Sequence, residues 1–323
     1  MDKIGTVSLF VRSKNGEDAQ IRVPLEHNRH MFSGSIPALV TPFGDDGSFD
    51  EPAFRAFVDW QIGEGSSALV PCGTTGEAAT LSFEEHFHVV RVCVEQAAGR
   101  VPVIAGAGSN DTRVAIVNIK AAKAAGADAA LMVPPYYNRP SQEGIFRHFE
   151  AVVNACDLPI VLYNVPGRTV TDILPETVAR IAKAFPGVVG IKDASGLVQR
   201  VSATRDLLGA GFAQISGNDD MALAFNASGG VGCISVTANV APRLCAEFQS
   251  ACEEGDYEAA LGLQDRLFAL HTSLFTDASP GPIKYAVSKL RGDFPTGIRL
   301  PMTWPGEESR KAVDAGLERA GIC

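Results

Sequence analysis

Lys192 is the residue of the sequence with the clearest capacity for chemistry, because it ends a run with the composition of a buried strand. Residues 188–191 read Val-Val-Gly-Ile, and the turn Asp-Ala-Ser-Gly follows the lysine. Such short β-branched runs are typical of strands that are covered on both faces of a parallel sheet. Two interpretations are open at this point. The ammonium group can extend to solvent, which is common for a strand-end lysine, or the desolvated amine can attack a carbonyl to form an imine.

Polar groups that could work with such an amine follow other strand-like runs. The turn Gly73-Thr-Thr-Gly76 offers backbone N–H groups and the hydroxyls of Thr74 and Thr75 to a carboxylate. It can equally be a plain glycine-rich turn, and it is not a P-loop because no Gly-Lys-Ser/Thr follows. The phenol of Tyr163 could carry a proton beside the lysine, or its ring could simply fill the interior of the fold.

Three further residues lie in loops after these runs. Arg168 could hold a carboxylate bidentately, although a solvated loop arginine is the more common arrangement. The adjacent Tyr136 and Tyr137 indicate a contact surface, which is either a subunit interface or part of a catalytic site. His86 and His88 are two residues apart on an expected helix and face different directions. We interpret both histidines as structural or peripheral rather than as metal ligands.

The chemical inventory favours one reaction class. The sequence contains no metal-ligand cluster, no GxGxxG motif after a first strand and no Ser-His-Asp pattern. An amine, a phenol, hydroxyls, an anion cradle and an arginine fit imine-forming carbon–carbon bond chemistry on a keto acid better than hydrolysis or redox chemistry. Because compatible groups follow five other strands, we interpret Lys192 as the nucleophile.

A regular alternation of strands and helices would position these groups. Apolar strand-like runs lie at residues 36–41, 68–71, 101–105, 129–133, 160–163, 188–191, 212–215 and 232–235. Amphipathic stretches such as 50–62, 83–97, 112–125, 142–155 and 175–184 separate most of them, with Ser82 and Ser141 as N-caps and Gly126 as a C-terminal signal. Eight such units predict an α/β fold, a (β/α)8 barrel of about 250 residues whose active site is at the carboxyl ends of the strands. A doubly wound sheet is the structural alternative.

Three segments follow from this pattern. Residues 1–30 are polar and form an N-terminal extension, expected to be flexible, which is either an appendage or the product of an upstream start. Residues 31–240 form the barrel core, and residues 241–323 form the last barrel helix plus a small helical appendage. Helical stretches are expected there at 242–253, 257–271, 281–290 and 307–320, and more than one helix after the last strand implies an appendage.

Composition narrows the class of protein. The 323 residues carry a net charge of −9, which argues against a general affinity for nucleic acid or acidic membranes. The seven cysteines are scattered and form no CxxC pattern, so we expect reduced thiols in a cytoplasmic enzyme. No apolar run of 18 residues occurs, so no membrane-spanning helix is expected.

The sequence from Met31 onward resembles the dihydrodipicolinate synthase / N-acetylneuraminate lyase superfamily, and within it the synthase branch. Six motifs occur in order: Gly34-Ser-Ile-Pro-Ala-Leu-Val-Thr-Pro42, Gly73-Thr-Thr-Gly-Glu77, Pro135-Tyr-Tyr-Asn-Arg-Pro-Ser-Gln-Glu-Gly144, Tyr163-Asn-Val-Pro-Gly-Arg-Thr169, Gly190-Ile-Lys-Asp-Ala-Ser195 and Gly232-Cys-Ile-Ser-Val-Thr-Ala-Asn239. The tyrosine-pair motif and the arginine of the fourth motif are fairly specific for the synthase branch.

The resemblance implies a metal-independent lyase, without organic cofactor, that condenses pyruvate with L-aspartate 4-semialdehyde in lysine and diaminopimelate biosynthesis. It implies catalytic roles for Lys192 as the imine-forming residue, Tyr163 as proton donor and acceptor, and Thr74 and Tyr137 as a proton relay. It implies substrate-binding roles for Thr75, Ile234 and Gly217 toward pyruvate and for Arg168 toward the carboxylate of the semialdehyde. The implied assembly is a homotetramer, a dimer of dimers, in which Tyr137 comes from the neighbouring subunit.

Two positions depart from the pattern of this superfamily. Asp193 follows the lysine where many relatives carry glutamate. Lysine-inhibited relatives usually place a glutamate four residues after the equivalent of Asn110, where this chain has Val114, so we expect weak or absent inhibition by lysine. Two alternatives to the synthase stay open: another pyruvate-dependent aldolase or lyase acting on a sugar acid or hydroxy-keto acid, and a barrel that binds a small acid without turnover.

Overall fold

The computed structural model describes residues 6–12, 18–24 and 30–322, and the chain divides between Met31 and Phe32 into two compact units. In the first unit, β1 (Thr6–Arg12) pairs antiparallel with β2 (Asp18–Pro24). The sequence analysis assigned no element to these residues. The expectation that residues 1–30 are a flexible extension concerns residues that lie in part outside those described, and it stays a prediction.

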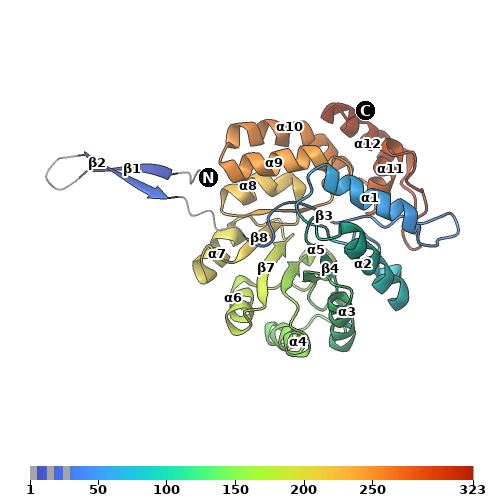
Figure 1. Ribbon diagram of the computed structural model, residues 1–323, viewed down its shortest axis with the longest axis horizontal. Helices are drawn as coiled ribbons and strands as arrows, with labels where there is room; N and C mark the ends of the chain where they lie inside the picture. Colours follow the sequence, from blue (N-terminus) through green and yellow to red (C-terminus); the bar gives the residue numbers. More distant parts are fainter. Residues whose placement is uncertain (1–5, 13–17, 25–29, 323) are drawn as a thin grey trace. The chain divides into compact units, whose positions relative to one another are not determined.

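The second unit is a barrel of parallel strands surrounded by helices (Figure 1). Seven strands follow one another in the order β3-β9-β8-β7-β6-β5-β4. Their bounds are β3 (Gly34–Pro37), β4 (Ile104–Gly106), β5 (Ala129–Met132), β6 (Ile160–Asn164), β7 (Val188–Asp193), β8 (Ala213–Ser216) and β9 (Gly232–Ser235). They are buried almost throughout, as expected for strands that are covered on one face by helices and on the other by the barrel interior.

The predicted second strand closes the barrel, although it is too irregular to count as a full strand. Residues 67–71 lie between β3 and β4 and bond to both. On one side, Val70 N–H donates to the Pro37 carbonyl at 3.0 Å; on the other, Ile104 N–H donates to the Leu69 carbonyl at 2.8 Å. Parallel bridges join Ala38 to Val70 and Leu69 to Val103. The predicted (β/α)8 barrel is therefore confirmed.

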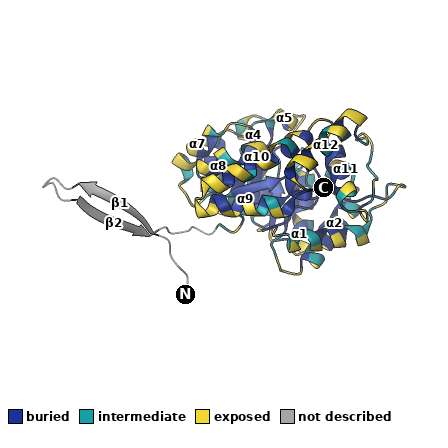
Figure 2. Ribbon diagram, turned by 90° about the horizontal axis from the view of Figure 1, so that it is seen from above, coloured by how far each residue is buried: buried dark blue, intermediate teal, exposed yellow. Residues whose placement is uncertain are grey.

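The predicted helices are present with bounds that differ by one or two residues. The helices of the barrel layer are α1 (Glu51–Gly63), α2 (Phe83–Ala97), α3 (Thr112–Ala124), α4 (Gln142–Ala155), α5 (Pro166–Thr169), α6 (Pro175–Ala184), α7 (Gln199–Leu208) and α8 (Ala222–Ala227). Ser82 forms the expected capping box with Glu85, and the Ser141 hydroxyl accepts a bond from Gly144 N–H. Each long helix presents a buried face to the strands and an exposed face outward (Figure 2).

Four further helices follow the last strand: α9 (Pro242–Glu254), α10 (Tyr257–Ser273), α11 (Gly281–Leu290) and α12 (Glu307–Ala320). The last three are the expected appendage, in which α10 packs against both α9 and α12. Residues Phe32–Cys323 form one compact unit, so the appendage packs closely on the barrel. The boundary at residue 240 stays a prediction.

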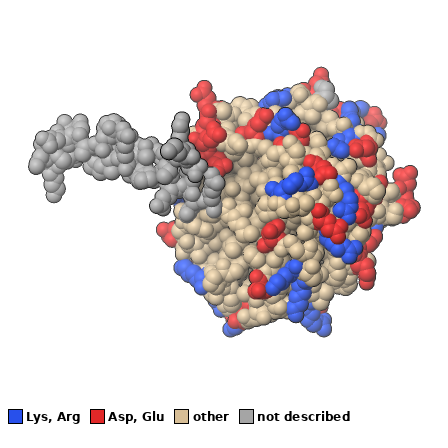
Figure 3. All heavy atoms as spheres, viewed as in Figure 1, with Lys and Arg blue, Asp and Glu red and all other residues tan. Residues whose placement is uncertain are grey.

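Two observations concern the protein classes that the composition argues against, nucleic-acid-binding and membrane proteins. Basic side chains lie among acidic ones on the face shown in Figure 3, in keeping with a net charge of −9. Among the described residues, no helix is long and apolar enough to span a membrane.

Candidate active site

Lys192 lies beside Tyr163 at the carboxyl ends of two adjacent strands. β6 and β7 pair in register, with Tyr163 opposite Lys192. Nζ of Lys192 lies 4.3 Å from the centroid of the Tyr163 ring, and the two residues are 5% and 8% exposed. Of the two interpretations of this lysine, the structure supports the buried one. The amine and the phenol-bearing ring are close enough to act on one substrate.

Two more of the predicted site residues lie beside the lysine or beside the tyrosine. Gly217 follows β8, and a Cβ atom built on it would lie 3.1 Å from Cε of Lys192 and 2.6 Å from Cβ of Ala194. Only a residue without a side chain fits there while the lysine keeps its place. Ile234 of β9 is fully buried and belongs to the apolar cluster in the barrel interior that contains Tyr163.

The turn that carries Thr74 and Thr75 keeps two amides free of backbone partners. Gly76 N–H donates to the Gly73 carbonyl at 3.1 Å, and Glu77 N–H donates to the Thr74 carbonyl at 3.2 Å. No backbone hydrogen bond from the amides of Thr74 or Thr75 is present among the described residues. Thr75 is buried and Thr74 is exposed. This arrangement suits an anion cradle better than a plain turn.

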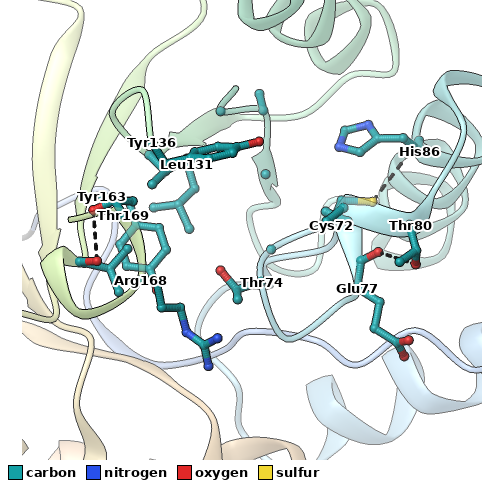
Figure 4. A pocket seen from close by; sticks show the side chains of 18 of the residues that line it. Cys72, Thr74, Glu77, Thr80, His86, Leu131, Tyr136, Tyr163, Arg168 and Thr169 are labelled. Carbon is teal, nitrogen blue, oxygen red and sulfur yellow. Dashed lines mark hydrogen bonds between the residues drawn. The ribbon is translucent and has the colours of Figure 1, made fainter. Parts of the chain in front are cut away.

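A cavity of about 390 Å³ lies against these elements. Its wall includes Thr74, Tyr163 and Arg168, three residues predicted for the site (Figure 4). Arg168 follows the Pro-Gly of α5 and is exposed, so its guanidinium is available to an anion. Within the described part of the chain, the lining does not include Lys192, Thr75, Ile234 or Gly217. Of these, Lys192 lies against the Tyr163 ring, and Ile234 belongs to the apolar cluster that contains Tyr163.

The two adjacent tyrosines take different positions. Tyr136 is 38% exposed and lines the cavity. Tyr137 is 90% exposed, has a left-handed backbone with φ of 69°, and does not belong to the lining in its own chain. A bulky residue rarely adopts this backbone conformation. Both the strain and the exposure fit a side chain that is presented to another molecule, which was one of the two interpretations of the pair.

The two histidines of α2 face different directions, as expected. Nε2 of His88 lies 2.9 Å from a carboxylate oxygen of Glu51 on α1. His86 is buried and lines the cavity, which fits the structural rather than the peripheral alternative for this residue. Burial lowers the pKa of His86, and its Nδ1 atom has no hydrogen-bond partner among the residues that the structure describes. No group of three or more potential metal ligands occurs among the described residues.

Several residues that support the site were not found from the sequence. Asn118 also lines the cavity, and its buried Oδ1 atom has no hydrogen-bond partner in the described part of the chain. Arg200 contacts Asp172 and Asp193 behind the strand ends. Lys284 of the appendage forms a buried ion pair with Glu77, the last residue of the Gly73–Glu77 motif. Arg200 and Lys284 meet partners that are distant in sequence, so no local pattern predicts these contacts.

The arrangement supports nucleophilic addition of an amine to a small acid. The buried amine of Lys192 supplies the nucleophile, and the phenol of Tyr163 can exchange protons beside it. The threonine turn and Arg168 offer two separate positions for carboxylates. Two separate acid-binding positions near one amine suit a reaction that joins two acids.

Comparison with known proteins identifies close relatives. A sequence profile of the Dihydrodipicolinate synthetase family matches residues 31–320. The 4-hydroxy-tetrahydrodipicolinate synthase of Rhizorhabdus wittichii is 69% identical over 292 residues, which cover 90% of this chain and 100% of that protein. The chloride-inhibited dihydrodipicolinate synthase from Acinetobacter baumannii, complexed with pyruvate, has a TM-score of 0.88 and 45% identity over 90% of this chain and 99% of its own. The enzyme from Cyanidioschyzon merolae with lysine bound has a TM-score of 0.88 and 35% identity, over 91% of this chain and 100% of its own.

Proposed function

The chain belongs to the dihydrodipicolinate synthetase family, and we propose that it condenses pyruvate with L-aspartate 4-semialdehyde to 4-hydroxy-tetrahydrodipicolinate. The observation that carries this proposal is the pairing of a buried Lys192 with Tyr163, Nζ to ring centroid 4.3 Å, at adjacent strand ends. The similar proteins carry the synthase name, and one of the similar solved structures holds pyruvate. The reaction class is that of a lyase.

The first half of the reaction forms an imine. The carboxylate of pyruvate binds the free amides of Thr74 and Thr75, while Ile234 and Gly217 shape the space beside Lys192. Nζ attacks the keto carbon, and loss of water gives the imine. Removal of a methyl proton then gives an enamine, with Tyr163 as the group that exchanges protons. The imine nitrogen is the electron sink, so the proposed mechanism uses no metal and no organic cofactor.

The second half joins the semialdehyde. Arg168 holds its carboxylate through charge-assisted hydrogen bonds, and the enamine carbon attacks its aldehyde carbon. The amino group of the semialdehyde then attacks the imine carbon, which closes the ring and releases Lys192. Thr74 and Tyr137 complete a proton relay with Tyr163. Since Tyr137 is 90% exposed in its own chain, we assign its phenol to the site of a neighbouring subunit.

The assembly follows from that assignment. We propose a homo-oligomer, a tetramer built as a dimer of dimers, in which each dimer exchanges Tyr137. We place the enzyme in the cytoplasm, because its buried cysteines are free thiols in the described residues. The two alternatives are another pyruvate-dependent aldolase or lyase and a non-catalytic acid-binding barrel. Arg168 on the cavity wall favours an acceptor that carries a carboxylate.

Two measurements test the proposal. Borohydride reduction in the presence of pyruvate, followed by peptide mass spectrometry, is expected to place a stable adduct on Lys192. Lys192→Ala should form no adduct, and Tyr163→Phe should still form it while losing about 10²–10⁴-fold in turnover. Absence of the adduct in the native chain would refute the imine mechanism. A coupled assay with L-aspartate 4-semialdehyde and a dihydrodipicolinate reductase then separates the synthase from an aldolase with another acceptor.

A further inference from the structure

The residues that directly follow Tyr163 and Lys192 are also paired. Asn164 of β6 lies opposite Asp193 of β7, one position beyond the tyrosine and the lysine. Successive side chains of a strand point to opposite faces, so these two point away from the side on which the tyrosine and lysine lie. Asn164 is fully buried and Asp193 is 9% exposed. Their side chains are therefore held in the layer between the strand ends and the helices.

Arg200 of α7 binds there. Its Nη1 atom donates to both carboxylate oxygens of Asp172 at 3.0 Å, and its Nε atom lies 3.2 Å from Oδ2 of Asp193. Its Nη2 atom donates to the carbonyl of Ile173. The side chain of Arg200 is only 9% exposed. One buried guanidinium thus joins β7 to the loop that follows α5.

Asn164 joins β6 to the same loop. Its Nδ2 atom donates to Oδ1 of Asp172 at 2.8 Å, and its Oδ1 atom accepts from Ile173 N–H at 2.9 Å. A closed ring of contacts results, which runs from Asn164 through Asp172 and Arg200 to Asp193 and back across the strand pair. We call these four residues the Arg200 clamp.

The clamp reaches the three elements that carry Lys192, Tyr163 and Arg168. Asp193 adjoins Lys192, Asn164 adjoins Tyr163, and Asp172 lies four residues after Arg168 in the same short segment. The Arg200 guanidinium hydrogen-bonds one carboxylate, that of Asp172, and forms an ion pair without a hydrogen bond among the described residues with the other, that of Asp193. A lysine cannot reproduce this planar arrangement of donors. A shift of either strand end or of the loop would break contacts at the guanidinium.

We propose that Arg200 is a positioning residue for both halves of the reaction. Through Asp193 it sets the placement of the Lys192 amine for imine formation, and through Asp172 it sets the placement of Arg168 for the carboxylate of the acceptor. The inference rests on the proposed function for its kinetic consequences. Its structural content, the placement of the lysine by the clamp, can be measured without substrate.

The proposal predicts that substitution of Asp193 affects imine formation, whereas substitution of Asp172 affects binding of the semialdehyde. Asp193→Asn should slow borohydride trapping of pyruvate by about tenfold, because small misplacements of a reacting group are costly. Asp172→Asn should leave the trapping rate near that of the native chain and raise the KM for the semialdehyde by about tenfold. Arg200→Met should show both effects, and Arg200→Lys should restore neither fully because it lacks the fork.

A buried pair remote from the cavity lining supplies the control. Nδ2 of Asn226 donates to Oε1 of Gln249 at 2.8 Å, and both residues are buried. Gln249→Ala should lower the melting temperature while leaving the trapping rate and both KM values unchanged. If the clamp variants change only the melting temperature, as the control does, the positioning role is refuted. Equal slowing of trapping by Asp172→Asn and Asp193→Asn would refute the division between the two halves.

A substrate-free measurement separates this inference from the proposed function. Labelling of Lys192 by trinitrobenzenesulfonate, followed by peptide mass spectrometry, reports the accessibility and reactivity of the amine. Arg200→Lys and Arg200→Met should both change the labelling rate, whereas Gln249→Ala should not. A native chain that forms no pyruvate adduct would refute the proposed function, while a changed labelling rate would still support the clamp. Unchanged labelling in both arginine variants would refute the clamp, whatever the activity.

Discussion

Nζ of Lys284 lies 2.6 Å from Oε1 of Glu77, and neither side chain is more than 1% exposed. Lys284 also donates to the carbonyl of Gly297 at 2.7 Å, and the second carboxylate oxygen of Glu77 accepts from Arg299 N–H at 3.0 Å. Glu77 ends the threonine turn in a left-handed conformation with φ of 55°. Helix α11 of the appendage therefore stabilises the turn that carries Thr74 and Thr75.

Removal of the lysine alone should be strongly destabilising. Lys284→Met leaves the Glu77 carboxylate buried with only one backbone donor, and breaking a buried pair in this way typically costs about 3–5 kcal/mol of unfolding free energy. The double variant Glu77→Gln with Lys284→Met should recover part of the loss, because the buried charge is gone. Urea unfolding of the two single variants and the double variant measures the coupling.

An exposed ion pair provides the comparison for this cycle. Nε of Arg243 lies 2.7 Å from Oε2 of Glu64, and the arginine side chain is 65% exposed. Arg243→Met should change the unfolding free energy by less than about 1 kcal/mol, because exposed pairs contribute little. A loss for Lys284→Met no larger than that for Arg243→Met would contradict the role assigned to the buried pair.

Gly217→Ala should impair the lysine directly. The added Cβ would lie 2.6 Å from Cβ of Ala194 and 3.1 Å from Cε of Lys192, both closer than ordinary contacts. We expect a loss of about 1–3 kcal/mol in unfolding free energy from overpacking, together with slower trapping of pyruvate on Lys192. Denaturant unfolding and the borohydride time course measure the two effects.

Gly211→Ala is the matched control for that substitution. A Cβ on this exposed glycine would meet no atom within 4 Å. Its stability and trapping rate should both stay near those of the native chain. If Gly217→Ala traps pyruvate at the rate of the Gly211→Ala control, then Gly217 does not shape the lysine site.

The sequence was sufficient for the barrel and for the strand-end chemistry, since both follow from local patterns. Runs of β-branched residues and helical periodicity predicted all eight strand positions, including the irregular segment at 67–71. The position of Lys192 after such a run left both a solvent-extended and a buried lysine open, and the polar groups after five other strands favoured the nucleophile. Local spacing also predicted the capping box at Ser82.

Long-range partners could not be predicted in this way. Lys284 and Glu77 are 207 residues apart, and nothing in the helix around Lys284 distinguishes it from a solvated lysine. Arg200 similarly meets Asp172 across 28 positions. Tyr136 lines the cavity and Tyr137 does not, and Tyr137 has a left-handed backbone. The sequence of two adjacent tyrosines does not predict this conformation. Contacts between residues that are far apart in sequence form only when the chain is folded, so local patterns do not predict them.

Buried histidines should make the protein sensitive to mild acid. His148 is 4% exposed, and burial lowers its pKa to about 4. Between the unfolded value of 6.5 and about 4, the unfolded chain binds a proton that the folded chain does not, so stability falls as pH falls through this window. Full stability is present above pH 6.5. His148 alone should account for about 3 kcal/mol of loss at pH 4.

Paired variants isolate this contribution. Urea unfolding at pH 7 and pH 4 should show that His148→Gln loses about 3 kcal/mol less than the native chain between the two conditions. The hydroxyl oxygen of Thr112 lies 2.9 Å from Nδ1 of His148. Thr112→Val keeps the titrating ring but removes a hydrogen bond to it, so most of the native loss between pH 7 and pH 4 should remain. Parallel behaviour of His148→Gln and the native chain would contradict the assignment.

Feedback by lysine should be weak. The side chain of Val114 in α3 offers no charge and no acceptor to an ammonium group, at the position where the resemblance implies a glutamate in lysine-inhibited relatives. His86 and Tyr136 nevertheless line the cavity, so space for a ligand is retained. Initial rates should therefore stay nearly constant up to millimolar L-lysine. Val114→Glu should introduce inhibition by restoring a carboxylate, whereas the size-matched Val114→Leu should not. Inhibition of the native chain at micromolar lysine would show that other groups hold the ammonium, and it would overturn the prediction.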